Sequence, residues 1–200
     1  MVCIKEAMSS TLAADLHRRS LELAGTHGAR RDGMSSGGGR SIYDVLDGFV
    51  VNKFLPELIG WYEATRWFLE ELVGRDVILS PFPRSAVNVN VYRPPLTGVG
   101  WHFDTNPLSV LLYLSEGNSP TEFQLADDRV LNVTPHLGDM LVFLGRKIRH
   151  QVPLGSGLRI TCPLNYYHPD DCSRPEWIDR AIYENSDFHS NPKAQTTDAG

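Results

Sequence analysis

A strict alternation of apolar and polar side chains occupies the middle of the chain. Residues 87–92 read Val-Asn-Val-Asn-Val-Tyr. A period of two is the side-chain period of a β-strand with one apolar and one polar face. The pattern therefore predicts a strand whose valines pack on a core while Asn90 and Tyr92 share the opposite face.

A His-x-Asp triplet follows this strand, after the turn-like residues 93–100. In an extended segment residues i and i+2 share a face, so His102 and Asp104 can reach one metal ion while Phe103 points away. His150 begins another extended segment downstream. Two imidazoles and one carboxylate are the ligand set of non-haem Fe(II) sites with open coordination positions. We therefore predict an iron site at His102, Asp104 and His150.

The chain contains a second His-x-Asp triplet, His168-Pro169-Asp170. Short motifs of this kind arise by chance, so context must decide between the two copies. The central proline disfavours an interior strand, and the triplet follows the last apolar segment with no well-placed third ligand downstream. We interpret this copy as a surface turn.

Six short segments between residues 90 and 167 carry a further signal when they are taken together. They are residues 90–92 (Asn-Val-Tyr), 100–104 (Gly-Trp-His-Phe-Asp), 111–114 (Leu-Leu-Tyr-Leu), 138–143 (Gly-Asp-Met-Leu-Val-Phe), 149–152 (Arg-His-Gln-Val) and 157–161 (Gly-Leu-Arg-Ile-Thr). In this order they resemble the Fe(II)/2-oxoglutarate-dependent dioxygenases. The resemblance implies a mostly β fold with flanking helices and a double-stranded β-helix (jelly-roll, cupin-like) core. It also implies Fe(II), 2-oxoglutarate as co-substrate and O2.

The same resemblance implies oxidation of an unactivated C–H bond of a small molecule, by hydroxylation, desaturation or ring closure, with release of succinate and CO2. The three iron ligands would be catalytic through the bound metal. Halogenases of this family carry a small residue where this chain has Asp104. The carboxylate therefore argues against halogenation.

2-Oxoglutarate needs a cation for its distal carboxylate. Arg159 lies in an apolar strand nine residues after His150, and its planar fork can bind a carboxylate bidentately. Thr161 lies on the same face and could donate a hydroxyl hydrogen bond. Asn90 and Tyr92 match the Asn-x-Tyr with which some family members contact the co-substrate. All four are predicted co-substrate ligands.

The substrate is less constrained. Arg146 and Arg149 precede His150, and Arg93 follows the alternating strand. One of them could hold a carboxylate-bearing small molecule such as an amino acid. The alternative is that these arginines lie on a solvated loop.

Two other functions remain open. The Asn-Val-Tyr and Gly-Trp-His-Phe-Asp elements also resemble AlkB-type nucleic-acid demethylases, within a wider class of oxygenases that modify macromolecules. Residues 164–167 lack the further arginine of the AlkB type, and a net charge of −5 with pI ≈ 5.8 gives no basic surface for nucleic acid. The second alternative is a non-enzymatic jelly-roll binding protein, against which the complete metal triad and Arg159 argue.

The chain length fits a single domain over residues 1–200. Residues 1–75 are expected to form a helical support, with helices over 11–23 (N-capped by Ser10 and followed by Gly25) and 56–73 (begun by Pro56 and ended by Gly74). The Gly-rich residues 26–41 predict a flexible loop that could order as a lid; they lack the Gly-Lys-Ser/Thr of a phosphate loop. Residues 76–170 are the expected β core, and 186–200 a disordered tail.

Three widely spaced cysteines predict neither a disulfide framework nor a zinc site. The sequence shows no membrane-spanning stretch and no signal peptide. These features predict a cytoplasmic protein that associates with neither membrane nor nucleic acid.

Overall fold

The computed structural model describes residues 1–34, 40–94, 97–116, 120–154 and 157–175. The helices are α1 (Ser10–Thr26), α2 (Gly48–Phe54), α3 (Pro56–Val73) and α4 (Pro83–Ala86). The strands are β1 (Val2–Ile4), β2 (Ala29–Met34), β3 (Arg40–Leu46), β4 (Ile78–Leu79), β5 (Val89–Tyr92), β6 (Gly98–His102), β7 (Leu108–Tyr113), β8 (Thr121–Gln124), β9 (Val130–Val133), β10 (Met140–Phe143), β11 (His150–Val152) and β12 (Arg159–Tyr167).

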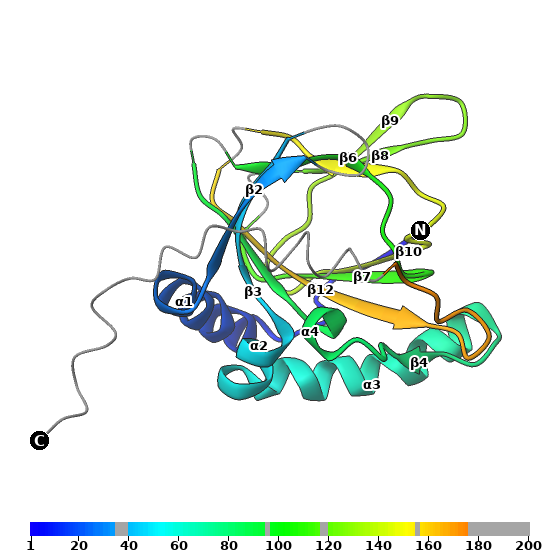
Figure 1. Cartoon of the computed structure of the whole chain (residues 1–200), viewed down its shortest axis with the longest axis horizontal. Helices are drawn as coiled ribbons and strands as arrows, with labels where there is room; N and C mark the ends of the chain where they lie inside the picture. Colours follow the sequence, from blue (N-terminus) through cyan, green and yellow to red (C-terminus); the bar gives the residue numbers. More distant parts are fainter. Residues whose placement is uncertain (35–39, 95–96, 117–119, 155–156, 176–200) are drawn as a thin grey trace, which may run out of the picture.

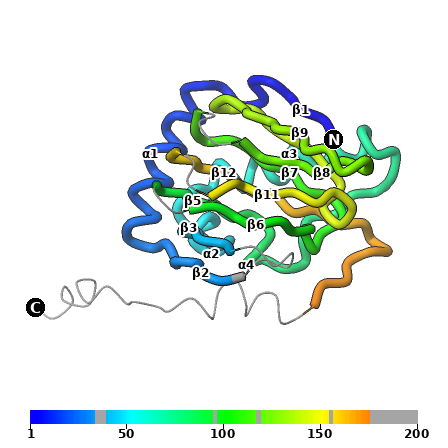
Figure 2. The backbone as a smooth tube through the Cα atoms, turned by 90° about the horizontal axis from the view of Figure 1, so that it is seen from above, coloured from blue at the N-terminus to red at the C-terminus, as the bar shows by residue number. Residues whose placement is uncertain are grey.

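The strands form one curled antiparallel sheet in the order β1-β10-β7-β12-β5-β3-β6-β11-β8-β9, with β2 on β3 and β4 on β12. β3 connects the two halves, because Asp44–Leu46 pair with β5 while Ser41 and Ile42 pair with β6. The half with β7 and β12 therefore faces the half with β6 and β11 (Figure 1). Figure 2 shows the β6-β11-β8-β9 half from above. The predicted jelly-roll fold is confirmed.

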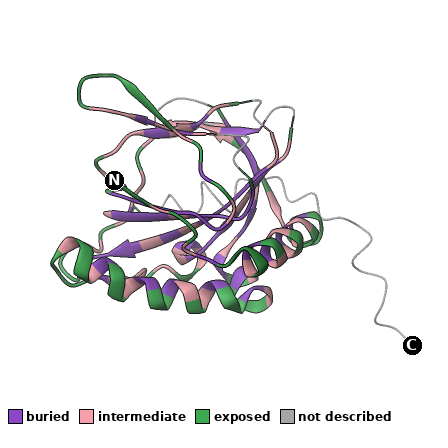
Figure 3. Ribbon diagram, turned by 180° about the vertical axis from the view of Figure 1, so that it is seen from behind, coloured by how far each residue is buried: buried purple, intermediate pink, exposed green. Residues whose placement is uncertain are grey.

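The helices cover the outer face of the β7-β12-β5 half, where the main core lies (Figure 1). Val89 and Val91 turn to this core, as do Ile160 and Cys162 of β12, so both predicted strand alternations are confirmed. The helices expose their other faces, and the strands beneath them are largely buried (Figure 3). No helix within the described residues is long and apolar enough to cross a membrane.

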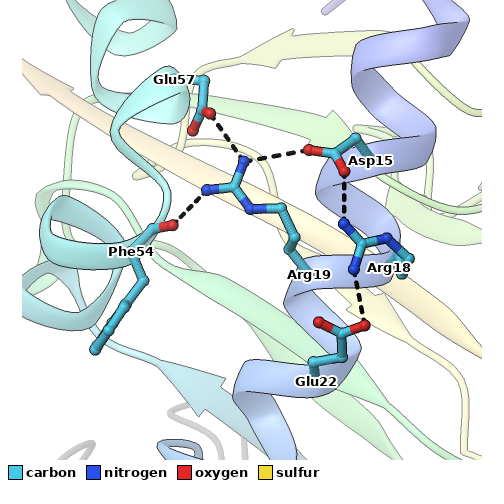
Figure 4. Close-up of polar contacts among 6 residues, drawn as sticks. All are labelled: Asp15, Arg18, Arg19, Glu22, Phe54 and Glu57. Carbon is cyan, nitrogen blue, oxygen red and sulfur yellow. Dashed lines mark hydrogen bonds and ion pairs between the residues drawn. The ribbon is translucent and has the colours of Figure 1, made fainter.

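An ion-pair cluster joins the helices to one another (Figure 4). Arg19 of α1 donates to the Phe54 carbonyl at the end of α2 (2.5 Å), to Glu57 of α3 (2.8 Å) and to Asp15 on its own helix (3.2 Å). In this cluster the neighbouring Arg18 donates to Asp15 and Glu22, which both belong to α1. The Arg19 side chain is 25% exposed and that of Arg18 is 60% exposed. Arg19 therefore links three helices, whereas Arg18 belongs to one helix surface.

Replacing Arg19 by methionine is expected to lower the free energy of unfolding by about 1–3 kcal/mol, because charge-assisted hydrogen bonds between helices are lost. Arg18→Met, the matched control, is expected to cost less than about 1 kcal/mol, as is usual for exposed pairs. Urea denaturation measures both values. Equal losses in the two variants would contradict the linking role of Arg19.

The predicted flexible loop over residues 26–41 is wrong where the structure describes it. Ala29–Met34 form β2, which pairs with residues 40–45 of β3. The sequence shows no strand signal here because β2 carries charged side chains instead of an apolar alternation, as is common for edge strands. Residues 35–39, with the glycine run, lie outside the described residues, and so does the predicted tail 186–200.

The description of residues 1–75 as a helical support is also incomplete, because β1, β2 and β3 contribute to the sheet. α3 begins at Pro56 and ends at Gly74 in the left-handed conformation, as predicted. α1 is longer than predicted. Its N-cap is Ser9 rather than Ser10, and it continues through Gly25 to Thr26.

Candidate metal centre

His102, Asp104 and His150 converge at the facing ends of two paired strands. His102 ends β6 and His150 begins β11, and the two are direct partners in the ladder. Asp104 Oδ1 lies 3.5 Å from His102 Nε2 and 3.6 Å from His150 Nε2. All three ligand atoms lie within 4.8 Å of one another. Ligands on an octahedral ion at about 2.1 Å stand about 3 Å apart, so small side-chain movements would close this set around a metal.

Backbone carbonyls orient both imidazoles. His102 Nδ1 lies 2.8 Å from the Gly100 carbonyl, and His150 Nδ1 lies 3.1 Å from the Ile148 carbonyl. A carbonyl can only accept, so each Nδ1 carries the proton and donates. Each Nε2 is then left with a lone pair directed at the Asp104 side. This is the tautomer that a metal-binding histidine requires.

The Asp104 carboxylate is fixed from its other oxygen. Ser109 Oγ donates to Asp104 Oδ2 at 2.5 Å, and Asn106 Nδ2 donates to Ser109 Oγ at 2.8 Å. Gly145 packs closely against both side chains, because a Cβ at this position would stand 2.4 Å from Ser109 Oγ and 2.9 Å from Asp104 Cβ. These three supports leave Oδ1 directed at the imidazoles. None of them was identified from the sequence, because none belongs to the motif.

The electrostatics of the site also favour a metal. Burial lowers the pKa of His150 to about 4, so this imidazole is neutral at physiological pH. Burial by itself would raise the pKa of Asp104. Four contributions oppose this effect and lower the pKa to about 2: the charge of protonated His150, the hydrogen bond from His102, the charge of His102 and the hydrogen bond from Ser109. A neutral imidazole and an ionised carboxylate are the protonation states of metal ligands.

Ser109→Ala is expected to weaken metal binding by roughly 10- to 100-fold, because the carboxylate loses the hydrogen bond that holds it. Titration of the protein with Co(II), followed by its visible absorption, measures the affinity. Ser115→Ala is a matched control, since Ser115 is also buried but its hydroxyl accepts from the Ile160 amide of β12. If both variants bind Co(II) like the wild type, Ser109 does not position the carboxylate.

The side chain of Arg159 lies between the two halves of the sheet, as do the three metal ligands. Its side chain is buried, donates to Thr121 Oγ1 at 2.7 Å, and stands 5.2 Å from the Tyr113 ring centroid and 5.7 Å from that of Tyr92. A continuous set of aromatic contacts connects the surroundings of Arg159 to the metal ligands. Tyr113 clusters with Phe123 and Phe143, and both of these rings contact His150.

The predicted co-substrate residues are brought together by strand register. Arg159 pairs with Tyr92, and Thr161 pairs with Asn90 on one side and Tyr113 on the other. Burial raises the pKa of Tyr92 above its usual range, although the charge of Arg159 and hydrogen bonding to Asn90 and Thr161 oppose the shift. Tyr92 therefore stays a neutral hydroxyl beside the guanidinium.

Two residues that surround Arg159 were missed from the sequence. Tyr113 Oη and Thr121 Oγ1 lie 2.6 Å apart, and Thr121 accepts from Arg159. Tyr113 belongs to the matching element 111–114, and its polar hydroxyl within this apolar segment was the available signal. Thr121 gave none, because its partner Arg159 is 38 residues away in the chain.

The three arginines considered for substrate binding each contact other parts of the protein. Arg93 pairs with Asp44 and donates to the Leu21 carbonyl (3.3 Å). Arg146 donates to the Thr105 carbonyl (2.7 Å) and pairs with Asp171. Arg149 donates to Gln124 (3.1 Å) and covers the Trp101 ring, on the side of β11 opposite to His150. These contacts favour structural roles.

The second His-x-Asp triplet takes no part in the centre. The triad is the one metal-ligand cluster found within the part of the chain that the structure describes. His168 is buried and its Nδ1 donates to the Asp76 carbonyl (2.8 Å), while the exposed Asp170 pairs with Arg75. The segment is a turn, as predicted, but His168 fixes it to the loop between α3 and β4.

The structure thus combines a jelly-roll fold with two histidines and a carboxylate that converge where β6 ends and β11 begins, which is a geometry suited to a metal ion. No family model and no curated protein matches the chain. Solved structures match it in fold. The epimerase SnoN, crystallised with Fe3+, α-ketoglutarate and nogalamycin RO, has a TM-score of 0.67 at 14% identity, with 87% of this chain and 81% of that chain covered.

Two further structures share the fold. The non-haem α-ketoglutarate-dependent carbocyclase SnoK from nogalamycin biosynthesis has a TM-score of 0.65 at 16% identity, over 84% of this chain and 81% of that chain. A prolyl hydroxylase of Trichoplax adhaerens, in complex with a hypoxia-inducible factor peptide, has a TM-score of 0.59 at 14% identity, over 86% and 84%. At these identities the similarity establishes the fold.

Proposed function

We propose that this protein is an Fe(II)- and 2-oxoglutarate-dependent oxygenase that oxidises a C–H bond of a small molecule. The proposal depends on one observation: the oriented metal triad and the buried Arg159 both lie inside the same curled sheet. A site that binds only a metal ion would need the three ligands and no buried arginine. A buried guanidinium beside it adds a site for a dicarboxylate that reaches the metal with its other end.

His102, Asp104 and His150 would hold the iron, since their ligand atoms converge and backbone carbonyls orient both imidazoles. Arg159 would bind the distal carboxylate of 2-oxoglutarate, with the hydroxyls of Thr121 and Thr161 beside it. When bound, iron and 2-oxoglutarate supply the oxidising chemistry, in which O2 is consumed and succinate and CO2 are released while the substrate is oxidised. The chain supplies ligands, orientation and shielding from water.

The neighbours support a small-molecule substrate, since SnoN and SnoK are named for nogalamycin biosynthesis. A peptide substrate is the second candidate, because the Trichoplax neighbour was crystallised with a peptide fragment. The carboxylate at Asp104 supports oxygenation rather than halogenation, since it occupies a coordination position that a halide would need. A non-catalytic binding protein would have no need of the buried Arg159 beside an oriented metal set.

Anaerobic reconstitution with Fe(II) and 2-oxoglutarate tests the proposal. A weak visible charge-transfer band is expected, followed by slow succinate release when O2 is admitted. Zn(II) is the control, because it fits the ligands but has no redox chemistry, and should give neither signal. Absence of both signals from the Fe(II)-loaded protein would overturn the proposal.

A further inference from the structure

Arg31 occupies a position on the interior side of the β2–β3 hairpin that the proposed function leaves unused. Arg31 is the direct cross-strand partner of Tyr43, and its guanidinium stands 5.7 Å from the Tyr43 ring centroid. The adjacent Arg30 points to the other face, where it pairs with Asp44 (3.2 Å). The alternation of a strand thus separates two neighbouring arginines onto opposite faces.

Tyr43 connects Arg31 to the proposed active site. The ring is buried and lies 5.3 Å from that of Tyr92, which in turn lies under the guanidinium of Arg159. Burial raises the pKa of Tyr43, the charge and hydrogen bonding of Arg31 lower it, and the negative charge of Asp104 raises it. The phenol is therefore neutral and within electrostatic reach of both Arg31 and the metal-ligand carboxylate.

The surroundings of Arg31 differ from those of the other arginines on this hairpin. Arg30 and Arg40 each pair with an aspartate, whereas within the described residues no carboxylate lies at ion-pair distance from Arg31. The wall beside it is apolar, with Val45 and Val152 packed against Tyr43. A half-buried cation next to an apolar wall is poorly solvated, so an anion from a ligand would gain a strong charge-assisted contact there.

We propose that Arg31 and the Tyr43 hydroxyl bind the carboxylate of the substrate, so that the enzyme oxidises a small carboxylic acid. This inference rests on the proposed oxygenase function. One guanidinium fork and one phenol match the two oxygens of a monoanionic carboxylate; a phosphate dianion would need further donors. Arg31 and Arg159 stand at opposite ends of the Tyr43–Tyr92 pair, so substrate and co-substrate would be held by separate cations.

The test uses matched pairs of small molecules with the Fe(II)- and 2-oxoglutarate-loaded protein. The panel comprises the twenty L-amino acids, short aliphatic acids and aromatic acids, each with its carboxamide, together with phosphate monoesters. Succinate release above the substrate-free rate is measured. At least one acid is expected to stimulate release, and its carboxamide is expected to do so at least about tenfold less well, because the amide is uncharged.

Variants then assign the contact. Arg31→Gln is expected to raise the KM for the stimulating acid by about 10- to 100-fold, Tyr43→Phe by less, and Arg31→Lys to recover part of the loss. Arg30→Gln is the matched control on the opposite face and should behave like the wild type. In all variants the substrate-free charge-transfer band should persist, which separates this inference from the oxygenase assignment.

The inference is overturned if no acid stimulates the wild type, if acids and carboxamides stimulate equally, or if phosphate esters alone do so. It is also overturned if Arg31→Gln keeps the wild-type KM. Loss of the band in the wild type would instead refute the oxygenase function itself.

Discussion

Asp104→Asn is expected to abolish succinate release by the Fe(II)-loaded protein, with a decrease of more than about 100-fold. Loss of a supporting hydrogen bond alone costs roughly 10- to 100-fold at metal sites, and this change removes the ligand charge itself. Asparagine keeps the shape of aspartate, so Ser109 and Gly145 can still pack around it. Co(II) titration and succinate release measure the two consequences.

Asp170→Asn is the matched control for this prediction. Asp170 occupies the same place in the second His-x-Asp triplet, but it is exposed and pairs only with Arg75 among its described contacts. It should keep wild-type Co(II) affinity and turnover. If Asp104→Asn and Asp170→Asn behave alike, the iron assignment is wrong.

Arg159→Gln is expected to raise the KM for 2-oxoglutarate by about 100-fold, which corresponds to roughly 3 kcal/mol. The distal carboxylate would lose a bidentate, buried cation and would be left poorly paired away from solvent. Metal binding should survive, because within the described residues Arg159 donates to Thr121 and lies over the Tyr92 and Tyr113 rings, while the metal ligands keep their own hydrogen bonds. Initial rates against 2-oxoglutarate concentration and a parallel Co(II) titration test these two expectations.

Arg149→Gln provides the comparison for Arg159→Gln. Arg149 adjoins a metal ligand in sequence, yet it faces Trp101 and Gln124 on the other side of β11. Its KM for 2-oxoglutarate should equal that of the wild type. An unchanged KM in Arg159→Gln would remove Arg159 from its proposed role, and a lost Co(II) site would indicate that the variant perturbs the whole interior.

The arginines show why substrate binding was harder to infer than metal binding. The sequence singled out Arg93, Arg146 and Arg149 because they flank the motif, and each turned out to contact other parts of the protein. Arg31 lies in a segment that composition suggested was a loop. It reaches the interior only because β2 pairs with β3, and β3 pairs with both halves of the sheet.

The sequence by itself determined the features that depend on short spacing. The alternation around Val89, the shared face of His102 and Asp104, and the shared face of Arg159 and Thr161 follow from the two-residue period of a strand. The approach of His150 to the other two metal ligands depends instead on the pairing of β11 with β6. The length of α3 follows in the same way from its proline start and glycine end. These are properties of neighbouring residues, and the structure places them accordingly.

Only the tertiary structure decided which distant side chains support that site. Ser109 and Gly145 hold Asp104, and Thr121 and Tyr113 surround Arg159, although no periodicity relates them. The physical reason is that the curled sheet brings together strands far apart in the chain. Their register, rather than local spacing, sets which hydroxyls and rings meet at the centre.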